Sequence, residues 1–235
     1  MTGLRRLLTI GALIGCGDES LSGREVGARL ASDPSLGGST NPFACTTCHA
    51  TGDPDGDRIY SGYTLADAAF RERFWGGAVL SLLDSVNFCA QFFMAGPALD
   101  PGSQEGRALY AFLESISDGP TPGLPLTVVE NVAQIGRGSA SRGEEVYRAA
   151  CRSCHGDAAT GAGRLPHPGL TDEDIVLPQW TRGYATDFPG VDPGLVVVEK
   201  VRHGQFFGVG GNMPLFAREM LSDEDLGALL SYLDL

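Results

Sequence analysis

Two short runs of cysteine and histidine carry the most reactive side chains of this sequence. They are Cys45-Thr-Thr-Cys48-His49 and Cys151-Arg-Ser-Cys154-His155. In each run the two thiols lie three residues apart, so one helical turn presents both on the same side. The adjacent histidine offers a ring nitrogen to a metal. Two thiols that reach the vinyl groups of a porphyrin, with an imidazole for its iron, are what a covalently bound haem requires.

Cys-x-x-Cys-His is the attachment signature of c-type haem. A redox dithiol would need a βαβ context, and none surrounds either run. A structural zinc site would require the two distant cysteine pairs to share one ion. The two runs therefore predict two haem c groups, held by the four cysteines, with His49 and His155 as iron ligands.

The composition excludes one class of partner. Seventeen Lys and Arg stand against 29 Asp and Glu, which gives a formal charge of −12, and Lys200 is the only lysine. Nucleic-acid binding needs a basic face that neutralises phosphates. We expect no nucleic-acid partner, and instead redox proteins whose docking surfaces are basic.

The first residues resemble an export signal. Arg5 and Arg6 precede nine small or apolar residues, 7–15, and then comes Cys16. This stretch is too short for a membrane span, which needs about 20 residues. Residues 13–16 resemble a bacterial lipobox, so we expect a signal peptide over 1–15 and a lipid anchor at Cys16. The alternative is an ordinary signal peptide with a chance cysteine. Either way, we expect a location in the periplasm or on the outer surface of a bacterium.

The elements around the two motifs repeat along the chain. Gly23-x-Glu25-Val26 matches Gly143-x-Glu145-Val146, with capping boxes predicted for Ser22 with Glu25 and for Ser141 with Glu144. In the same order follow the two tryptophans, Trp75 and Trp180, then Met94 and Met213, then helices opened by Ser103 and Ser222. The first helix lies 14 residues farther from its motif than the second (Gly23 to Cys45 against Gly143 to Cys151). This order indicates a tandem duplication.

Each repeat unit reads as helix, haem motif, loops, methionine and helix, which resembles the class I cytochrome c fold. The paired arrangement is similar to dihaem c-type cytochromes. We therefore expect an all-α chain of two tandem class I cytochrome c domains with long loops. The expected divisions are a signal over 1–15, a first domain over 16–118, a linker over 119–138 and a second domain over 139–235.

For the second haem, the resemblance assigns Met213 as the sixth iron ligand, with His203 as a rival. It also assigns to Pro168 the carbonyl that receives the imidazole N–H of the proximal histidine. Trp75 and Trp180 are expected beside the haem edges, each with its indole N–H on a propionate. Plain core packing is the alternative for both.

The first haem has two candidate sixth ligands, and an open position or a histidine is the remaining alternative. The internal repeat selects Met94, whereas Cys89 is an unpaired cysteine that needs a reason. The stretch around Cys89 resembles the first haem domain of thiosulfate dehydrogenases and sulfur-oxidation cytochromes, in which the cysteine is an iron ligand. The matching positions are Gly96, Leu99, Ser103 and Glu105, while Phe92 replaces an arginine of that family.

Two functions follow from these alternatives. The first is electron transfer between extracytoplasmic partners through two haems. The second is an oxidoreductase that joins sulfur anions at the first haem, with Cys89 as the catalytic residue and the second haem passing the electrons on. An anionic substrate would need cations, for which Arg71, Arg73 and Arg107 are candidates.

Overall fold

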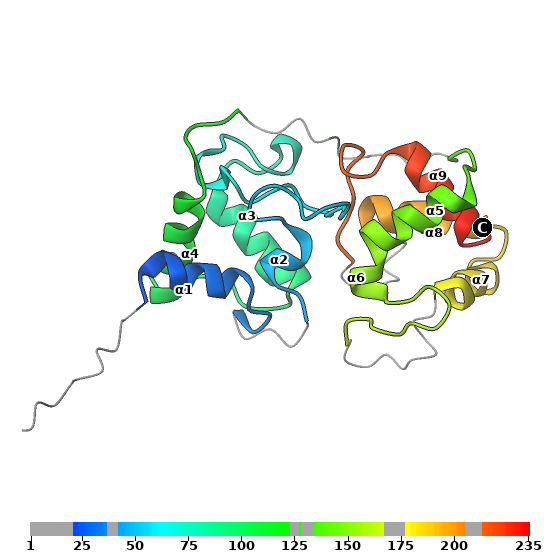
Figure 1. Ribbon diagram of the computed structural model, residues 1–235, viewed down its shortest axis with the longest axis horizontal. Helices are drawn as coiled ribbons and strands as arrows, with labels where there is room; N and C mark the ends of the chain where they lie inside the picture. Colours follow the sequence, from blue (N-terminus) through cyan, green and yellow to red (C-terminus); the bar gives the residue numbers. More distant parts are fainter. Residues whose placement is uncertain (1–20, 37–41, 123–126, 128–133, 167–176, 205–212) are drawn as a thin grey trace, which may run out of the picture.

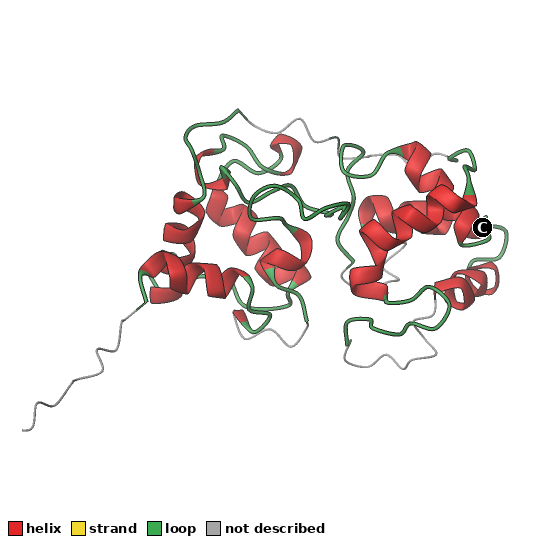
Figure 2. Cartoon of the chain, in the orientation of Figure 1, coloured by secondary structure: helices red, strands yellow, loops and turns green. Residues whose placement is uncertain are grey.

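The chain folds into two groups of helices, each around its own hydrophobic core (Figure 1). The computed structural model describes residues 21–36, 42–122, 127, 134–166, 177–204 and 213–235, without the side chains of 177–180 and 182. Within these residues the regular structure is helical, apart from two isolated β-bridges (Figure 2). The expected all-α fold is confirmed. None of the described helices is long and apolar enough to cross a membrane.

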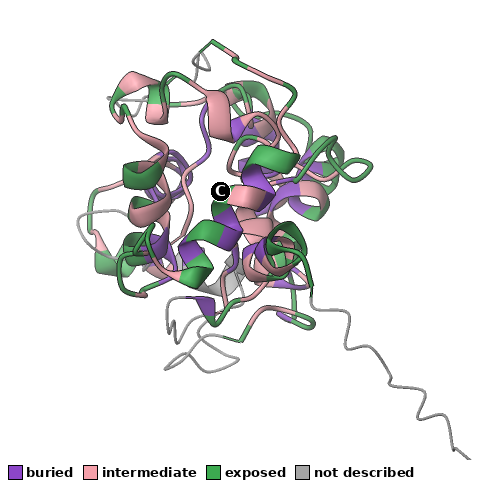
Figure 3. Cartoon of the chain, turned by 90° about the vertical axis from the view of Figure 1, so that its left-hand side faces the viewer, coloured by how far each residue is buried: buried purple, intermediate pink, exposed green. Residues whose placement is uncertain are grey.

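In the first group, helix α1 (Gly23–Ala31) packs across helix α4 (Gln104–Ser115). Between them in the chain lie α2 (Cys45–Cys48), the short helices η2 (Ala68–Phe70) and η3 (Trp75–Gly77), and α3 (Leu82–Phe88), which runs into the π-helical turn η4 (Cys89–Phe93). The core comprises Ala31, Leu36, Met94, Leu109, Phe112 and Leu113. Figure 3, which views this group from its side, shows buried stretches on the inner surfaces of the helices.

In the second group, α5 (Ala140–Val146) packs across α9 (Asp223–Tyr232), as α1 does across α4. The π-helical turn η5 (Tyr147–Cys151) continues α5 directly into α6 (Arg152–His155), and the second motif starts at the last residue of η5 and ends with α6. Helices α7 (Leu177–Asp187) and α8 (Pro193–His203) complete the group. The last helix buries an apolar face, which consists of Leu226, Leu229, Leu230 and, just after the helix, Leu233.

A glycine allows the close helix crossing in each group. A Cβ on Gly27 would lie 2.0 Å from the Ala108 carbonyl oxygen, and one on Gly143 would lie 2.1 Å from that of Ala228. Gly27, not Gly23, is therefore the counterpart of Gly143, and the predicted register of the first helix was wrong by about one turn. Because Gly27 is four residues nearer to Cys45, the extra loop of the first unit is ten residues long rather than 14.

Three of the four predicted helices begin after the serine that was predicted as their N-cap. Ser22 and Glu25 form the predicted capping box, while Ser103 and Ser222 accept hydrogen bonds from the first turns of α4 and α9. The capping box predicted for Ser141 was wrong. Helix α5 begins two residues earlier, after Ser139, so Ser141 lies inside its first turn and bonds the Ser139 hydroxyl at 2.8 Å.

The two groups touch through loops that come from both. The main-chain N–H of Ile59 donates to the Ala149 carbonyl at 3.0 Å, and the Ile59 side chain packs against the second core. Thr127, from the expected linker, donates to both carboxylate oxygens of Glu219 at 2.9 and 2.5 Å. In Figure 1 the loop before residue 60 and the segment that follows residue 213 meet between the groups. The predicted domain limits remain a prediction.

Candidate haem site

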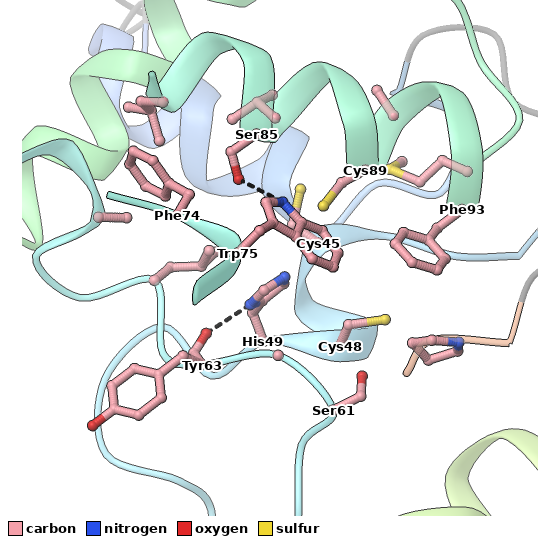
Figure 4. Close-up of a pocket in the computed structure, with 18 of the residues that line it drawn as sticks. Cys45, Cys48, His49, Ser61, Tyr63, Phe74, Trp75, Ser85, Cys89 and Phe93 are labelled. Atoms are coloured by element: carbon pink, nitrogen blue, oxygen red, sulfur yellow. Dashed lines mark hydrogen bonds between the residues drawn. The ribbon is translucent and has the colours of Figure 1, made fainter. Parts of the chain in front are cut away.

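The first motif lines a large apolar pocket between α2, α3 and the loops that follow the motif. Cys45, Cys48 and His49 form one side of the pocket, and Cys89 and Met94 also line it. In Figure 4 the His49 ring points into the pocket from α2, and the Cys89 thiol points in from the helix on the other side. The structure thus brings together both predicted thioether cysteines, the predicted proximal histidine and both candidates for the sixth ligand.

His49 is oriented by the main chain beyond it. Its Nδ1 lies 2.6 Å from the Tyr63 carbonyl oxygen, so the Nδ1–H donates and Nε2 keeps its lone pair. Burial is the main cause of the lowered pKa of His49, opposed by the Tyr63 carbonyl and assisted by Arg71. A neutral imidazole with its outer nitrogen held by a carbonyl is what an iron ligand requires.

Gly62 allows this orientation. A Cβ at this position would lie 2.1 Å from His49 Cε1, so only glycine lets the chain pass beside the ring. The sequence analysis missed both this contact and the Tyr63 carbonyl.

The two cysteines of the motif are half-buried, and their thiols are free. Cys45 and Cys48 form no disulfide, and burial raises the pKa of both, that of Cys48 to about 11. Burial also raises the pKa of Cys89 to about 12, with smaller contributions from the nearby Cys45 and Cys48 thiols. These sulfur atoms lie in one apolar space and remain protonated at neutral pH.

The π-helical turn η4 brings both candidate sixth ligands to the same pocket. The Met94 N–H donates to the Cys89 carbonyl at 3.0 Å, five residues back. Met94 is 4% exposed and belongs to the first core, whereas Cys89 is half-buried. Such turns occur often at functional sites. The structure leaves both residues as candidates.

Trp75 belongs to an aromatic cluster beside the pocket. Its ring is stacked with Phe93 at 6.1 Å between centroids and meets the edge of Phe88 at 4.9 Å. The indole N–H, expected on a propionate, donates instead to the Ser85 hydroxyl at 3.2 Å. Figure 4 shows the indole between His49 and α3.

Of the three predicted cationic residues, two line the pocket. Arg71 donates to the carbonyls of Thr64 (2.6 Å) and Ala66, and Arg73 also lines the wall. Arg107 is not among the lining residues; it is exposed on α4 and donates to the Gly102 carbonyl. A cation is therefore present at the pocket, although Arg71 already serves two main-chain acceptors.

The second motif occupies the corresponding place in its group. Burial raises the pKa of Cys151 to about 12 and lowers that of His155 to about 4, so His155 is neutral. Met213 is partly buried against the second core. The rival ligand His203 lies 2.7 Å from Glu199 Oε1, one turn back on α8.

The structure does not place the side chains of three predicted positions. Cys16 and Pro168 lie outside the described residues, and Trp180 is in α7 without a described side chain.

The donor set of the first pocket fits a covalently bound haem. Two free thiols lie one helical turn apart, a neutral imidazole presents Nε2, and two sulfur side chains line the same apolar space. The described residues include no group of three or more His, Cys, Asp or Glu side chains that is placed to hold a metal ion by itself.

Comparison with known proteins gives one family match, which lies in the C-terminal part of the chain. Residues 138–233 match the family described as "Cytochrome C oxidase, cbb3-type, subunit III". This part of the chain is similar to a c-type cytochrome domain. The family carries covalently bound haem c, and electron transfer through haem is its chemistry.

The other two comparisons add little. No curated protein matches the sequence. Among solved structures, thiosulfate dehydrogenase (TsdBA) from Marichromatium purpuratum, in its as-isolated form, aligns with a TM-score of 0.42 and 17% identity. The alignment covers 90% of this chain and 45% of that one, so this chain spans less than half of its length.

Proposed function

We propose that the chain is a dihaem c-type cytochrome that transfers electrons between extracytoplasmic redox partners. The first pocket carries this proposal, because its Cys-x-x-Cys-His motif lies outside the residues that match the cytochrome family and yet the pocket assembles a full haem donor set. In the proposal Cys45 and Cys48 hold one haem, and Cys151 and Cys154 hold the other. His49 and His155 are their proximal ligands.

Haem iron, when bound, supplies a one-electron couple whose potential rises with a methionine ligand. The protein residues orient and shield it. Tyr63 holds His49 through Nδ1, and Gly62 leaves the ring its space. Apolar walls from Leu65, Leu109 and Leu113 keep water from the pocket. Met94 or Cys89 is the sixth ligand of the first haem, and Met213 that of the second.

The two attachment segments lie close together, which supports passage of electrons between the sites. Arg58 donates to the Thr47 carbonyl at 3.0 Å, inside the first motif. The same guanidinium lies near the Cys154 thiol of the second, where it opposes the rise in pKa that burial causes. The Cys154 thiol also contributes to the raised pKa of Cys48, after the larger effect of burial.

The remaining parts of the proposal rest on the sequence. They are cytochrome units over 16–118 and 139–235, joined by the linker 119–138, and a signal over 1–15 with a lipid anchor at Cys16. The acidic chain favours partners with basic docking surfaces. The location is the periplasm or the outer surface of a bacterium.

Haem counting tests the proposal. The full chain, expressed with a c-type maturation system, is expected to carry two haems by haemochrome absorbance and intact mass. The Cys45→Ser, Cys48→Ser double variant is expected to keep one, as is the matched Cys151→Ser, Cys154→Ser variant. A single haem in the unaltered chain contradicts the dihaem proposal.

The alternative function is an oxidoreductase acting on sulfur anions, and the place of Cys89 and Arg71 in one pocket favours it. Two such anions would join through a new sulfur–sulfur bond and release two electrons, one for each haem. Thiosulfate should then reduce the purified protein, and Cys89→Ala should abolish this while Met94→Ala leaves it. No reduction by thiosulfate eliminates the alternative.

The spectra of the same variants identify the sixth ligand of the first haem. Loss of a methionine–iron absorption band in Met94→Ala assigns Met94. A changed spectrum in Cys89→Ala alone assigns Cys89, because thiolate and thioether ligands give different bands.

A further inference from the structure

The extended segment 213–217 contacts both helix groups. Met213 and Phe216 pack with the second core. Pro214, Leu215 and Ala217, from the same segment, line the pocket of the first motif. The first pocket is therefore partly built by the second group. In Figure 4 this part of the chain enters at the right, beside Cys48.

Helix α8 holds this segment from behind. The Phe216 N–H donates to the Val201 carbonyl at 2.8 Å. Gly204, at φ +80°, lies against the Met213 main chain, where a Cβ would come within 2.4 Å of the Met213 carbonyl oxygen. These two contacts fix the position of the segment against the C-terminal end of α8.

Arg202 makes the largest number of hydrogen bonds around this segment. Its side chain is 1% exposed, and Nη1 donates to the carbonyls of Phe216 at 2.9 Å and Leu221 at 2.8 Å. Nη2 donates to Asp223 Oδ1 at 2.6 Å, at the start of α9. One buried guanidinium therefore ties the turn after the segment to both flanking helices. Its loss would leave two carbonyls in the interior without this donor.

We propose that 213–217 is a shared wall, which closes the first haem site and at the same time presents Met213 to the second, and that Arg202 is the positioning residue that keeps it in place. The inference rests on the proposed dihaem function. It implies that loosening one segment opens both haem sites together, although Arg202 touches neither motif.

Binding of imidazole to the oxidised holoprotein tests this proposal, because an external ligand binds faster where the protein shields the iron less. In Arg202→Met, the rate of imidazole binding is expected to rise about tenfold or more at both haems, since buried carbonyls lose their donor. In Leu215→Ala, which leaves the clamp intact, it is expected to rise at the first haem alone. The Cys45→Ser, Cys48→Ser variant, with the second haem only, assigns the signals.

Arg142→Met is the matched control. Arg142 is half-exposed and pairs with Asp225 at 2.7 Å, so its loss removes an arginine–carboxylate pair between α5 and α9 without touching the shared wall. Its imidazole rates should equal those of the unaltered protein. A response of the second haem alone in Arg202→Met, or no response of the first haem in Leu215→Ala, overturns the shared wall.

Two further outcomes are decisive. If Arg202→Met does not fold, Leu215→Ala decides the inference by itself, because it deletes only part of a half-buried side chain. Failure of the proposed function looks different: the unaltered chain then carries fewer than two haems. If the unaltered chain carries two haems but Leu215→Ala does not change the rate of imidazole binding at the first haem, the shared wall is rejected. The proposed dihaem function is unaffected by that result.

Discussion

At the scale of the residue, the orientation of His49 depends on glycine at position 62, which has no side chain. Gly62→Ala would place a methyl group 2.1 Å from the imidazole, so the ring must turn away from the Tyr63 carbonyl. Overpacking of this kind costs about 1–3 kcal/mol. We expect a weakened iron–histidine bond at the first haem, seen as a high-spin fraction in the absorption spectrum.

Gly52→Ala is the control for this prediction. Gly52 follows the same motif, and a Cβ there meets nothing within 4 Å. Its spectrum should equal that of the unaltered protein. An unchanged spectrum in Gly62→Ala would show that the loop yields instead of the ring.

Lys200 gives the second prediction at this scale. It is 7% exposed in α8, with Nζ 4.8 Å from the centre of the Tyr184 ring, and burial lowers its pKa from 10.5 to about 8. Between these values the unfolded chain holds a proton that the native chain lacks. The free energy of unfolding therefore rises with pH across this window, by at most about 3 kcal/mol, and the full cost of burying the charge is present below pH 8.

Denaturant titrations from pH 7 to pH 10 test this. Lys200→Met should flatten the rise, and since Lys200 is the only lysine, no other side-chain ammonium titrates in this range. The window ends at pH 10 because the buried Tyr147 and Tyr184 phenols have raised pKa values, which reduce stability above it. Equal pH slopes in both proteins would contradict the shifted pKa.

At the scale of the element, the helix crossing at Gly143 determines how closely α5 and α9 pack. Gly143→Ala brings a methyl group within 2.1 Å of the Ala228 carbonyl, so the helices must separate. We expect the second group to lose about 1–3 kcal/mol of stability. Gly183→Ala is the control, because Gly183 lies in α7 with open space at its Cβ, and alanine there should stabilise the helix by up to about 1 kcal/mol. Thermal unfolding of the two variants should shift in opposite directions.

Elements also show what the sequence could and could not predict. Helices with a serine cap and an apolar face, such as those after Ser103 and Ser222, were predictable because cap and periodicity are local signals. The register of the first helix was not, since Gly23 and Gly27 both lie one turn apart on that helix and only the contact with Ala108 selects one of them.

The residues of the site also separate into those that the sequence could predict and those that it could not. The motif residues were predictable because thioether and imidazole chemistry fixes their types and spacing. The π-helical turn at Cys89 and the wall from Leu215 were not, because they depend on packing between segments far apart in the chain. Residues that act through the main chain, such as Tyr63, leave no side-chain signature.

At the scale of the whole molecule, charge governs encounters. A formal charge of −12 attracts cations and repels anions over about 10 Å at 0.1 M salt, the distance at which salt screens charges. Reduction by a small cationic mediator, such as a ruthenium hexaammine, should therefore be faster at low salt than reduction by an anionic mediator of similar driving force. Electrostatic attraction of this kind changes association rates by about tenfold or more. In stopped-flow measurements the two rates should converge as salt rises, and equal salt dependence for both mediators would show that the acidic surface lies away from the point of electron entry.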